Sequence, residues 1–216
     1  MEVNILVGGA AGQGMDTVMN LLGKALVREG YGLIYTKDYM SRVRGGHNFS
    51  RLRISSGAQW TNLETIDIMV ALNEETFKLH RAEMAPSGRI IYDPAHFELP
   101  EDENRGVPVE LRDLAKEAGG AIMGNSVAVG ALLVLIGLQT ASVETLLKET
   151  FAGKDGVAEN NVKALKAGYD AAAHYCSACF TLPRQLKVKK DSSLMATRFW
   201  ACQPWPAVVV FYRPIQ

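Results

Sequence analysis

The sequence predicts an α/β protein with a Rossmann-like layered fold, a mostly parallel sheet flanked by helices, and a helical C-terminal half. Two observations support this prediction. In roughly the first hundred residues, short apolar runs alternate with amphipathic stretches, which is the order that builds βα units. From residue 109 onward the apolar spacing is helical. We therefore expect one domain over residues 1–181, followed by a linker and an irregular tail over 182–216.

The individual elements follow from the spacing of apolar residues. Apolar runs that stop at glycine or polar residues predict strands at 4–9, 31–36, 66–72 and 88–93. The stretch 48–56 alternates less cleanly, as in a hairpin strand or a strand at the sheet edge. Apolar positions after residue 14 form one helical stripe, which Gly30 ends. Further helices are expected at 73–84, 109–119, 125–138, 142–151 and 161–175.

The composition excludes several classes of protein. The 216 residues carry 23 Lys and Arg and 23 Asp and Glu, so the net charge is zero, unlike the strongly basic domains that coat nucleic acid. The apolar run 127–138 is too short to span a bilayer. No basic region precedes the first apolar residues, so we expect no signal peptide. The prediction is a cytoplasmic protein without a nucleic-acid or membrane partner.

The cysteines give little support for a metal or redox site. Cys176 and Cys179 form a CxxC after an alanine-rich helical stretch, and the third cysteine is Cys202. Metal and iron–sulfur sites usually need four ligands, and a redox CxxC normally opens a helix rather than ending one. We therefore expect ordinary free thiols.

A glycine-rich loop, GGAAGQG, follows the first expected strand and opens the first helix. This is the context in which backbone N–H groups bind a phosphate. The spacing is G-x-x-G-x-G rather than G-x-G-x-x-G, and Lys37 precedes Asp38 where an acidic ribose ligand is usual. Three alternatives remain: a dinucleotide site, a site for another ligand's phosphate or for a partner chain, and a tight turn that serves packing alone.

The segment SRVRGGHNFSRLR at 41–53 gathers positive charge around two glycines. With Lys37 and Asp38 included, the local excess is four positive charges, and guanidinium groups suit carboxylates and phosphates. The loop after the second strand should lie beside the loop after the first, where ligands bind in doubly wound folds. Arg51 and Arg53 share one strand face, and the alternative for them is a solvated, charged edge strand. His47 either donates to an anion or is structural.

Four stretches in order, AAGQG, SRVRGGHNFSRLRIS, IDIMVALN and GNSVAVGALL, resemble the gamma component of the 2-oxoacid:ferredoxin oxidoreductases, the family of the pyruvate and 2-oxoglutarate enzymes. The resemblance covers about residues 3–180, and it is strongest to the N-terminal part of fused gamma–alpha chains. The indolepyruvate-type enzymes rank second.

The resemblance implies a role within a complex. The complete enzyme decarboxylates a 2-oxoacid on thiamine diphosphate with Mg²⁺, transfers electrons through iron–sulfur clusters to ferredoxin, and forms an acyl-CoA. The cofactors belong to alpha and beta partner subunits, CoA is a co-substrate, and the gamma domain shapes the approach of CoA and substrate. The implied ligand-facing residues are Gly12, Gln13 and Gly14 in the first loop, Arg44, Gly45, Gly46, His47 and Asn48 in the second, and Asn125. Arg44 is the candidate for an anion contact, and no residue is assigned a catalytic or metal-binding role.

Two further hypotheses remain, a stand-alone nucleotide- or CoA-binding module and a nicotinamide-dependent dehydrogenase. The tail is a separate question. KVKKDSS resembles the linker of the fused chains, and SLMAT suits the start of an alpha domain, but RFWACQPWPAVVVFYRPIQ does not. We expect a frameshift or truncation there, and the alternative is a short gamma tail that docks on a partner.

Overall fold

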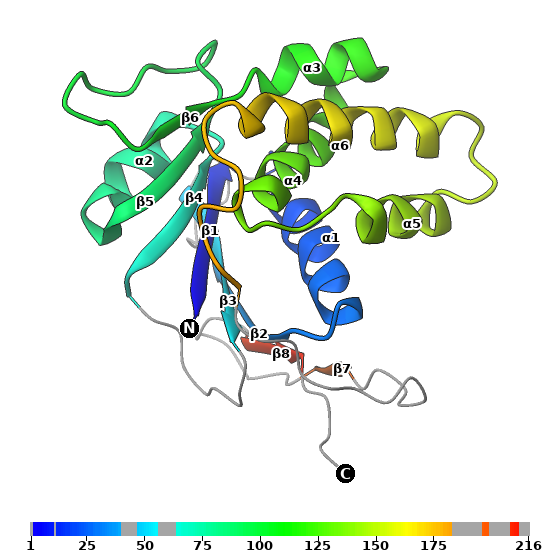
Figure 1. Cartoon of the computed structure of the whole chain (residues 1–216), viewed down its shortest axis with the longest axis horizontal. Coiled ribbons are helices and arrows are strands. Elements are labelled where there is room, and N and C mark those ends of the chain that lie inside the picture. The colour runs from blue at the N-terminus through cyan, green and yellow to red at the C-terminus, as the bar shows by residue number, and fades with distance from the viewer. Residues whose placement is uncertain are drawn as a thin grey trace.

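The computed structural model describes residues 2–10, 12–39, 47–55 and 64–182, together with the backbone of two short strands at 196–198 and 208–211. Within these residues the chain forms one sheet with helices on both faces (Figure 1). The α/β class and the helical C-terminal half are confirmed.

The sheet has the order β6-β5-β4-β1-β3-β2-β8-β7. Strands β1, β4, β5 and β6 are parallel, whereas β3 is antiparallel to both β1 and β2. The strands are β1 (Val3–Ala10), β2 (Gly32–Tyr39), β3 (His47–Ser55), β4 (Ile66–Ala71), β5 (Met84–Tyr92), β6 (Gly106–Pro108), β7 (Ala196–Arg198) and β8 (Val208–Phe211). The sheet is therefore mixed, with its parallel part on one side of β1.

Strand β3 separates the two alternatives given for it. It pairs antiparallel with the preceding strand β2, as expected of a hairpin strand, and it is not an edge strand, because it lies between β1 and β2 and pairs with each over most of its length. One face of β3 packs Leu52 and Ile54 into the main core. The other face carries Arg51 and Arg53, and each is paired with a carboxylate. The polar half of the alternating pattern therefore reflects ion pairs within the protein rather than exposure to solvent.

The helices divide between the two faces of the sheet. The larger core lies under α1, α3, α4, α5 and α6, whereas α2 covers a smaller core on the other face through Phe77. The helices are α1 (Met15–Arg28), α2 (Glu74–His80), α3 (Leu111–Ala118), α4 (Gly124–Leu135), α5 (Ala141–Thr150) and α6 (Val157–Ala173), with short 3-10 turns at Arg81–Glu83 and Ala121–Met123. None of the helices in the described part of the chain is both long and apolar enough to cross a membrane.

Helices α4 and α6 pack backbone against backbone. A Cβ added at Gly130 would overlap the carbonyl oxygen of Leu165, and one added at Gly168 would overlap that of Val127. Between the helices, the Ser126 hydroxyl donates a buried hydrogen bond to Asn161 Oδ1 at 2.7 Å. Glycine at these two positions therefore sets how closely the two helices approach.

The segment after α6 is fixed on the end of α4. The backbone N–H groups of Ala178 and Phe180 donate to the carbonyls of Val134 and Leu135, at 2.8 and 3.0 Å. The sulfur atoms of Cys176 and Cys179 lie side by side in this segment, and the expectation of free thiols at these two positions stays a prediction. The turn between them brings the two Cα atoms to 5.9 Å, which is within reach of a disulfide.

Candidate functional site at the carboxyl edge of the sheet

The two loops singled out in the sequence meet at one edge of the sheet. Ala10, the last residue of β1, pairs with His47, the first residue of β3. Tyr39, the last residue of β2, pairs with Asn48. The loops after β1 and β2 therefore leave the same edge, as expected, although β3 separates the two strands. Three of the predicted site residues, Arg44, Gly45 and Gly46, lie outside the described residues.

Two glycines of the first loop, Gly12 and Gly14, differ in what surrounds them. Gly12 and Gly14 both adopt positive φ, 89° and 85°, which favours glycine. A Cβ at Gly14 would overlap the side chain of Asn125 at the start of α4, whereas one at Gly12 would meet nothing within 4 Å among the described residues. Gly14 is therefore required for packing, and Gly12 leaves open space at the edge. The structure places Asn125 next to this loop, and its ligand-facing role stays a prediction.

Gln13 folds back into the loop. Its Oε1 accepts a hydrogen bond from the backbone N–H of Ala10 at 2.6 Å, and its Nε2 donates to the carbonyl of Leu72 at 3.4 Å. These contacts tie the ends of β1 and β4 together. In this structure Gln13 thus positions the loop through its side chain.

His47 is buried, with 2% of its surface exposed, and belongs to a chain of polar side chains on the α2 face. Its Nε2 lies 2.9 Å from Nε2 of His80, and His80 Nδ1 lies 2.8 Å from Glu83 Oε1. Glu83 Oε2 is bound by the guanidinium of Arg51. The Nδ1 atom of His47 is buried and has no hydrogen-bond partner among the residues that the structure describes.

The charges of His47 and Glu83 follow from their surroundings. Burial and the neighbouring His80 lower the pKa of His47, although Glu75 and Asp38 oppose the shift. Burial raises the pKa of Glu83, but hydrogen bonds from His80 and Arg51 outweigh it, so the pKa is lowered. At neutral pH, Glu83 is a carboxylate and His47 is a neutral imidazole.

Three of the five cations counted in the sequence are already paired. Lys37 Nζ lies 2.6 Å from Asp16 Oδ1. Arg51 is paired with Glu83, and Arg53 with Glu2. The local excess of positive charge is therefore reduced by carboxylates from other parts of the chain, which sequence proximity does not reveal. Arg42 and Arg44 lie outside the described residues.

On the opposite face of the sheet, where α1 lies, Tyr35 forms a second polar group with Asp16 and Ser50. The Tyr35 hydroxyl lies 3.3 Å from Ser50 Oγ and donates to Asp16 Oδ1 at 3.4 Å. Burial raises the pKa of Tyr35, although Ser50 and Lys37 oppose the shift, so the phenol stays neutral. Asn48 is also buried at this end of β3.

Sequence reasoning missed His80, Glu83, Asp16 and Tyr35. His80 lies 33 residues from His47 and Tyr35 lies 19 from Asp16, so no local spacing could have indicated these contacts. The one available signal was the position of His80 and Glu83 near the end of an expected helix, three residues apart.

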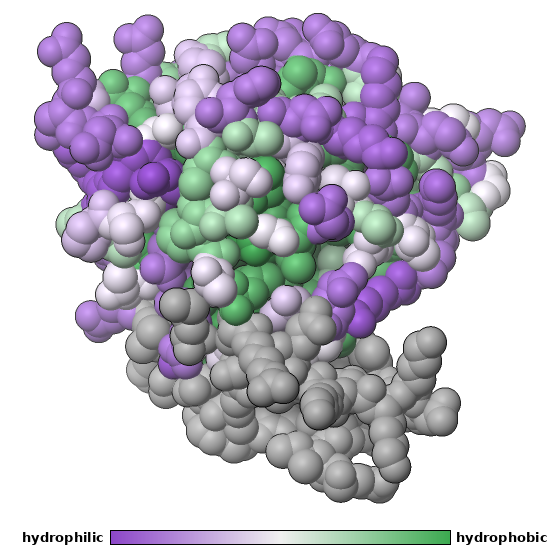
Figure 2. All heavy atoms as spheres, in the orientation of Figure 1, coloured by the Kyte–Doolittle hydropathy of each residue, from purple (hydrophilic) through white to green (hydrophobic). Residues whose placement is uncertain are grey.

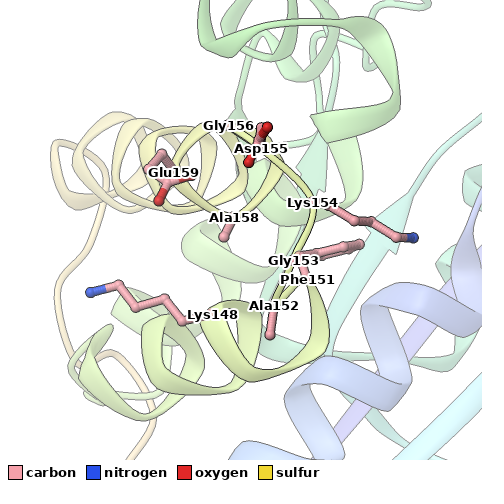
Figure 3. Close-up of a pocket in the computed structure, with 9 residues that line it drawn as sticks. All are labelled: Lys148, Phe151, Ala152, Gly153, Lys154, Asp155, Gly156, Ala158 and Glu159. Atoms are coloured by element: carbon pink, nitrogen blue, oxygen red, sulfur yellow. The ribbon is translucent and has the colours of Figure 1, made fainter.

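A hollow elsewhere, at the α5–α6 connection, is less suited to a ligand. It has a volume of about 370 Å³, and its lining comprises Lys148, Phe151, Ala152, Gly153, Lys154, Asp155, Gly156, Ala158 and Glu159. In Figure 3 the amino groups of Lys148 and Lys154 point to opposite sides, so the charged groups do not converge. Across the described ranges, no group of three or more His, Cys, Asp or Glu is arranged to hold a metal ion.

Comparison with known proteins gives a consistent family. The family described as pyruvate ferredoxin/flavodoxin oxidoreductase matches residues 4–171. Ketoisovalerate oxidoreductase subunit VorA of Methanothermobacter marburgensis is 30% identical over 179 residues, covering 79% of this chain and 37% of the relative. 2-Oxoglutarate synthase subunit KorC of Archaeoglobus fulgidus is 26% identical over 171 residues, covering 78% of this chain and 87% of the relative.

Solved structures share the fold. The 2-oxoglutarate:ferredoxin oxidoreductase of Magnetococcus marinus superimposes with a TM-score of 0.80 at 25% identity, covering 90% of this chain and 35% of that one. A keto/oxoacid ferredoxin oxidoreductase gamma subunit of Geobacter sulfurreducens gives 0.70 at 24% identity, covering 81% and 98%. This chain thus spans about a third of some relatives and nearly all of others. Because the family match extends over more than half of its length, the chain belongs to the pyruvate ferredoxin/flavodoxin oxidoreductase family.

Proposed function

We propose that this chain is the gamma component of a 2-oxoacid:ferredoxin oxidoreductase, which converts a 2-oxoacid to an acyl-CoA and passes electrons to ferredoxin. The observation that carries this proposal is the family match over residues 4–171, which includes both loops of the carboxyl edge. The Magnetococcus enzyme with the same fold is described with 2-oxoglutarate, coenzyme A and succinyl-CoA bound.

Within the complex, the carboxyl edge is the surface we assign to the approach of CoA and substrate. Gly12 leaves room at the edge, Gly14 and Asn125 fix the loop, and His47 and Asn48 begin the strand that follows the arginine-rich segment of the sequence. Arg44 supplies the anion contact in this proposal.

The described residues do not suit the cofactors of the reaction. Across the described segments, no group of three or more His, Cys, Asp or Glu is arranged to hold a metal ion. We therefore assign thiamine diphosphate, Mg²⁺ and the iron–sulfur clusters to alpha and beta partner subunits. In that arrangement this chain binds and orients rather than carrying out the chemistry.

The surface agrees with a component that needs partners. Figure 2 shows apolar side chains gathered in the middle of the viewed face, over the segment that follows α6, with hydrophilic side chains along its upper rim. Large apolar side chains are also exposed individually, with 81% of Ile122 and 53% of Tyr175 accessible. The contiguous patch supports a contact site for another chain, whereas single exposed apolar residues are ordinary in monomeric proteins.

The sheet order argues against a nicotinamide-dependent dehydrogenase. In a dinucleotide site, an acidic residue near the end of the second strand binds the ribose beside the first loop. Here β3 separates β1 from β2, so the ends of the two strands lie two strand spacings, about 10 Å, apart. A stand-alone nucleotide- or CoA-binding module remains the second candidate, and an indolepyruvate-type component the third.

The decisive experiment is purification of the tagged chain from its source cells, with the co-eluting chains identified by mass spectrometry. The proposal expects a thiamine-diphosphate-binding subunit and a cluster-bearing subunit, and reduction of ferredoxin that requires both CoA and a 2-oxoacid. Pyruvate, 2-oxoglutarate, ketoisovalerate and indolepyruvate should be compared as substrates. Recovery of the chain alone, with saturable binding of CoA, would instead favour the stand-alone module.

We further propose that residues 182–216 are a linker and an altered start of an alpha-type domain. The longer relatives, of which this chain spans about a third, support this proposal. Reading the coding DNA beyond this point in all frames tests it. An alpha-like continuation in another frame is the expected result, and its absence would favour a docking tail.

A further inference from the structure

With both imidazoles neutral, the buried series of Glu83, His80 and His47 has one arrangement of protons. Glu83 is ionised and can only accept, so His80 Nδ1 carries a proton and donates to it. In a neutral His80, Nε2 is then an acceptor. The 2.9 Å contact therefore requires His47 Nε2 to carry the proton that lies between the two rings.

This arrangement of protons determines the state of His47 Nδ1, the atom at the far end of the hydrogen-bonded series. With its proton on Nε2, neutral His47 presents a lone pair at Nδ1, the buried atom that has no partner. A buried acceptor without a partner costs free energy, so native proteins rarely retain one without a use. The atom belongs to the first residue of β3, directly opposite the end of β1.

We propose that Glu83, His80 and His47 form a proton relay whose open end, the Nδ1 atom of His47, accepts a proton at the carboxyl edge of the sheet. When a proton binds to Nδ1, the Nε2–H bond of His47 breaks and that proton passes to His80 Nε2. His80 becomes an imidazolium held against the Glu83 carboxylate, and His47 stays neutral with its proton now on Nδ1.

The surrounding charges fit a relay with one added proton. Arg51 balances Glu83, so the resting group of Arg51, Glu83 and two neutral imidazoles has no net charge. Glu75 and Asp38 are the other carboxylates whose field reaches His47, and they favour the added proton. Two protonated imidazoles at 2.9 Å would repel each other, so the pair takes up one proton rather than two.

The relay also determines which chemical groups can form a hydrogen bond with His47 Nδ1. In the resting state, Nδ1 suits the proton of a hydroxyl or thiol group. It becomes a donor, and thus a partner for an anion, only after the pair has gained a proton. Glu83 and Arg51 act here as positioning residues through His80. This inference is independent of the proposed activity, because it can be measured in the chain itself.

The test is a pH titration of the ¹⁵N-labelled chain, with imidazole tautomers followed by long-range ¹H–¹⁵N correlation spectra. We expect His47 to carry its proton on Nε2 at neutral pH, and the pair to take up one shared proton on acidification. Glu83→Gln should move that uptake to lower pH and mix the tautomers of His80. Arg51→Gln, which leaves the carboxylate without its cation, should move it to higher pH.

Glu2→Gln is the matched control, because it removes a carboxylate from an ion pair with Arg53 on the same strand. It should leave both imidazole titrations unchanged. The relay is refuted if His47 carries its proton on Nδ1 at neutral pH, or if both rings titrate independently and respond alike to Glu83→Gln and Glu2→Gln. If Glu83→Gln does not fold, the Arg51→Gln shift decides between the same outcomes.

Discussion

At the scale of single residues, the first loop shows how one residue type can serve two purposes. Gly12 and Gly14 have nearly the same positive φ, but only Gly14 lies against a side chain, that of Asn125. The glycine pattern was predicted from the sequence. The division between packing and open space was not, because it depends on Asn125, which is more than a hundred residues away in the chain.

Alanine at the two glycines should separate these purposes. Gly12→Ala places a non-glycine residue at positive φ and should lower the free energy of unfolding by about 1–2 kcal/mol. Gly14→Ala carries the same backbone cost and must also displace Asn125, so it should cost more. Chemical denaturation measures both. In an Asn125→Ala background the difference should shrink, and an unchanged difference would remove Asn125 as its cause.

Arg44 carries the residue-level prediction for function. Losing a charge-assisted hydrogen bond to an anion costs about 1.5–3 kcal/mol. In the assembled enzyme, Arg44→Ala should therefore raise the KM for CoA or for the 2-oxoacid at least several-fold. Arg28→Ala is the control, because Arg28 forms an exposed ion pair with Glu149 at the opposite end of α1. Equal kinetics for both variants would exclude Arg44 from the site.

At the scale of elements, the sequence predicted those strands and helices whose apolar residues are strongly periodic. It missed the features that depend on how the strands pair. β1, α1, β4 and α4 lie within a few residues of their expected ranges. β6 was missed because only three residues pair with β5. The interior position of β3 was missed because Arg51 and Arg53 are indistinguishable in sequence from solvated residues, and only their distant partners Glu83 and Glu2 make burial possible.

The contact between α4 and α6 predicts opposite effects for two helical glycines. Gly23→Ala in α1 meets only Leu33 Cδ1 at 3.7 Å, so it should stabilise the protein by about 0.5–1 kcal/mol through helix propensity. Gly130→Ala in α4 would overlap the backbone of α6 and should destabilise by about 1–3 kcal/mol. Thermal and denaturant unfolding measure both. A neutral Gly130→Ala would show that the helices can separate freely.

At the scale of the whole molecule, the buried His47 couples stability to pH. In the unfolded chain its imidazole binds a proton below the ordinary pKa of about 6.5. In the native chain the lowered pKa of His47 resists protonation. Because the unfolded state binds more protons, stability falls as pH drops below about 6.5, down to the lowered pKa of His47.

His47→Gln should therefore flatten the decline of the unfolding free energy below about pH 6.5. His96→Gln is the control and should keep the wild-type slope, because it removes an exposed imidazole and leaves the buried His47 in place. Denaturant titrations at a series of pH values provide the measurement. A slope that is equally steep in His47→Gln would assign the acid sensitivity to other groups.

The family and the architecture could thus be inferred from the sequence, because short motifs in a fixed order identify a shared fold. The candidate site was predicted only in part. Its glycines and Asn125 came from motifs, whereas the partners of His47 come from β3 and α2 lying against each other. Contacts between distant segments depend on the sheet order, which periodicity does not determine.

The hydrogen bonds that hold Ala178 and Phe180 on the end of α4 have a consequence for how this domain can be joined to others. They fix the last part of the described domain at the carboxyl end of α4, whereas Asn125, which lies against the first loop, is at the opposite end of that helix. A polypeptide attached after residue 182 is therefore tethered to a point that does not contact the first loop. Such a tether raises the effective concentration of the attached domain. A fixed attachment point of this kind suits both a separate subunit and a part of a longer chain, the two lengths found among the relatives.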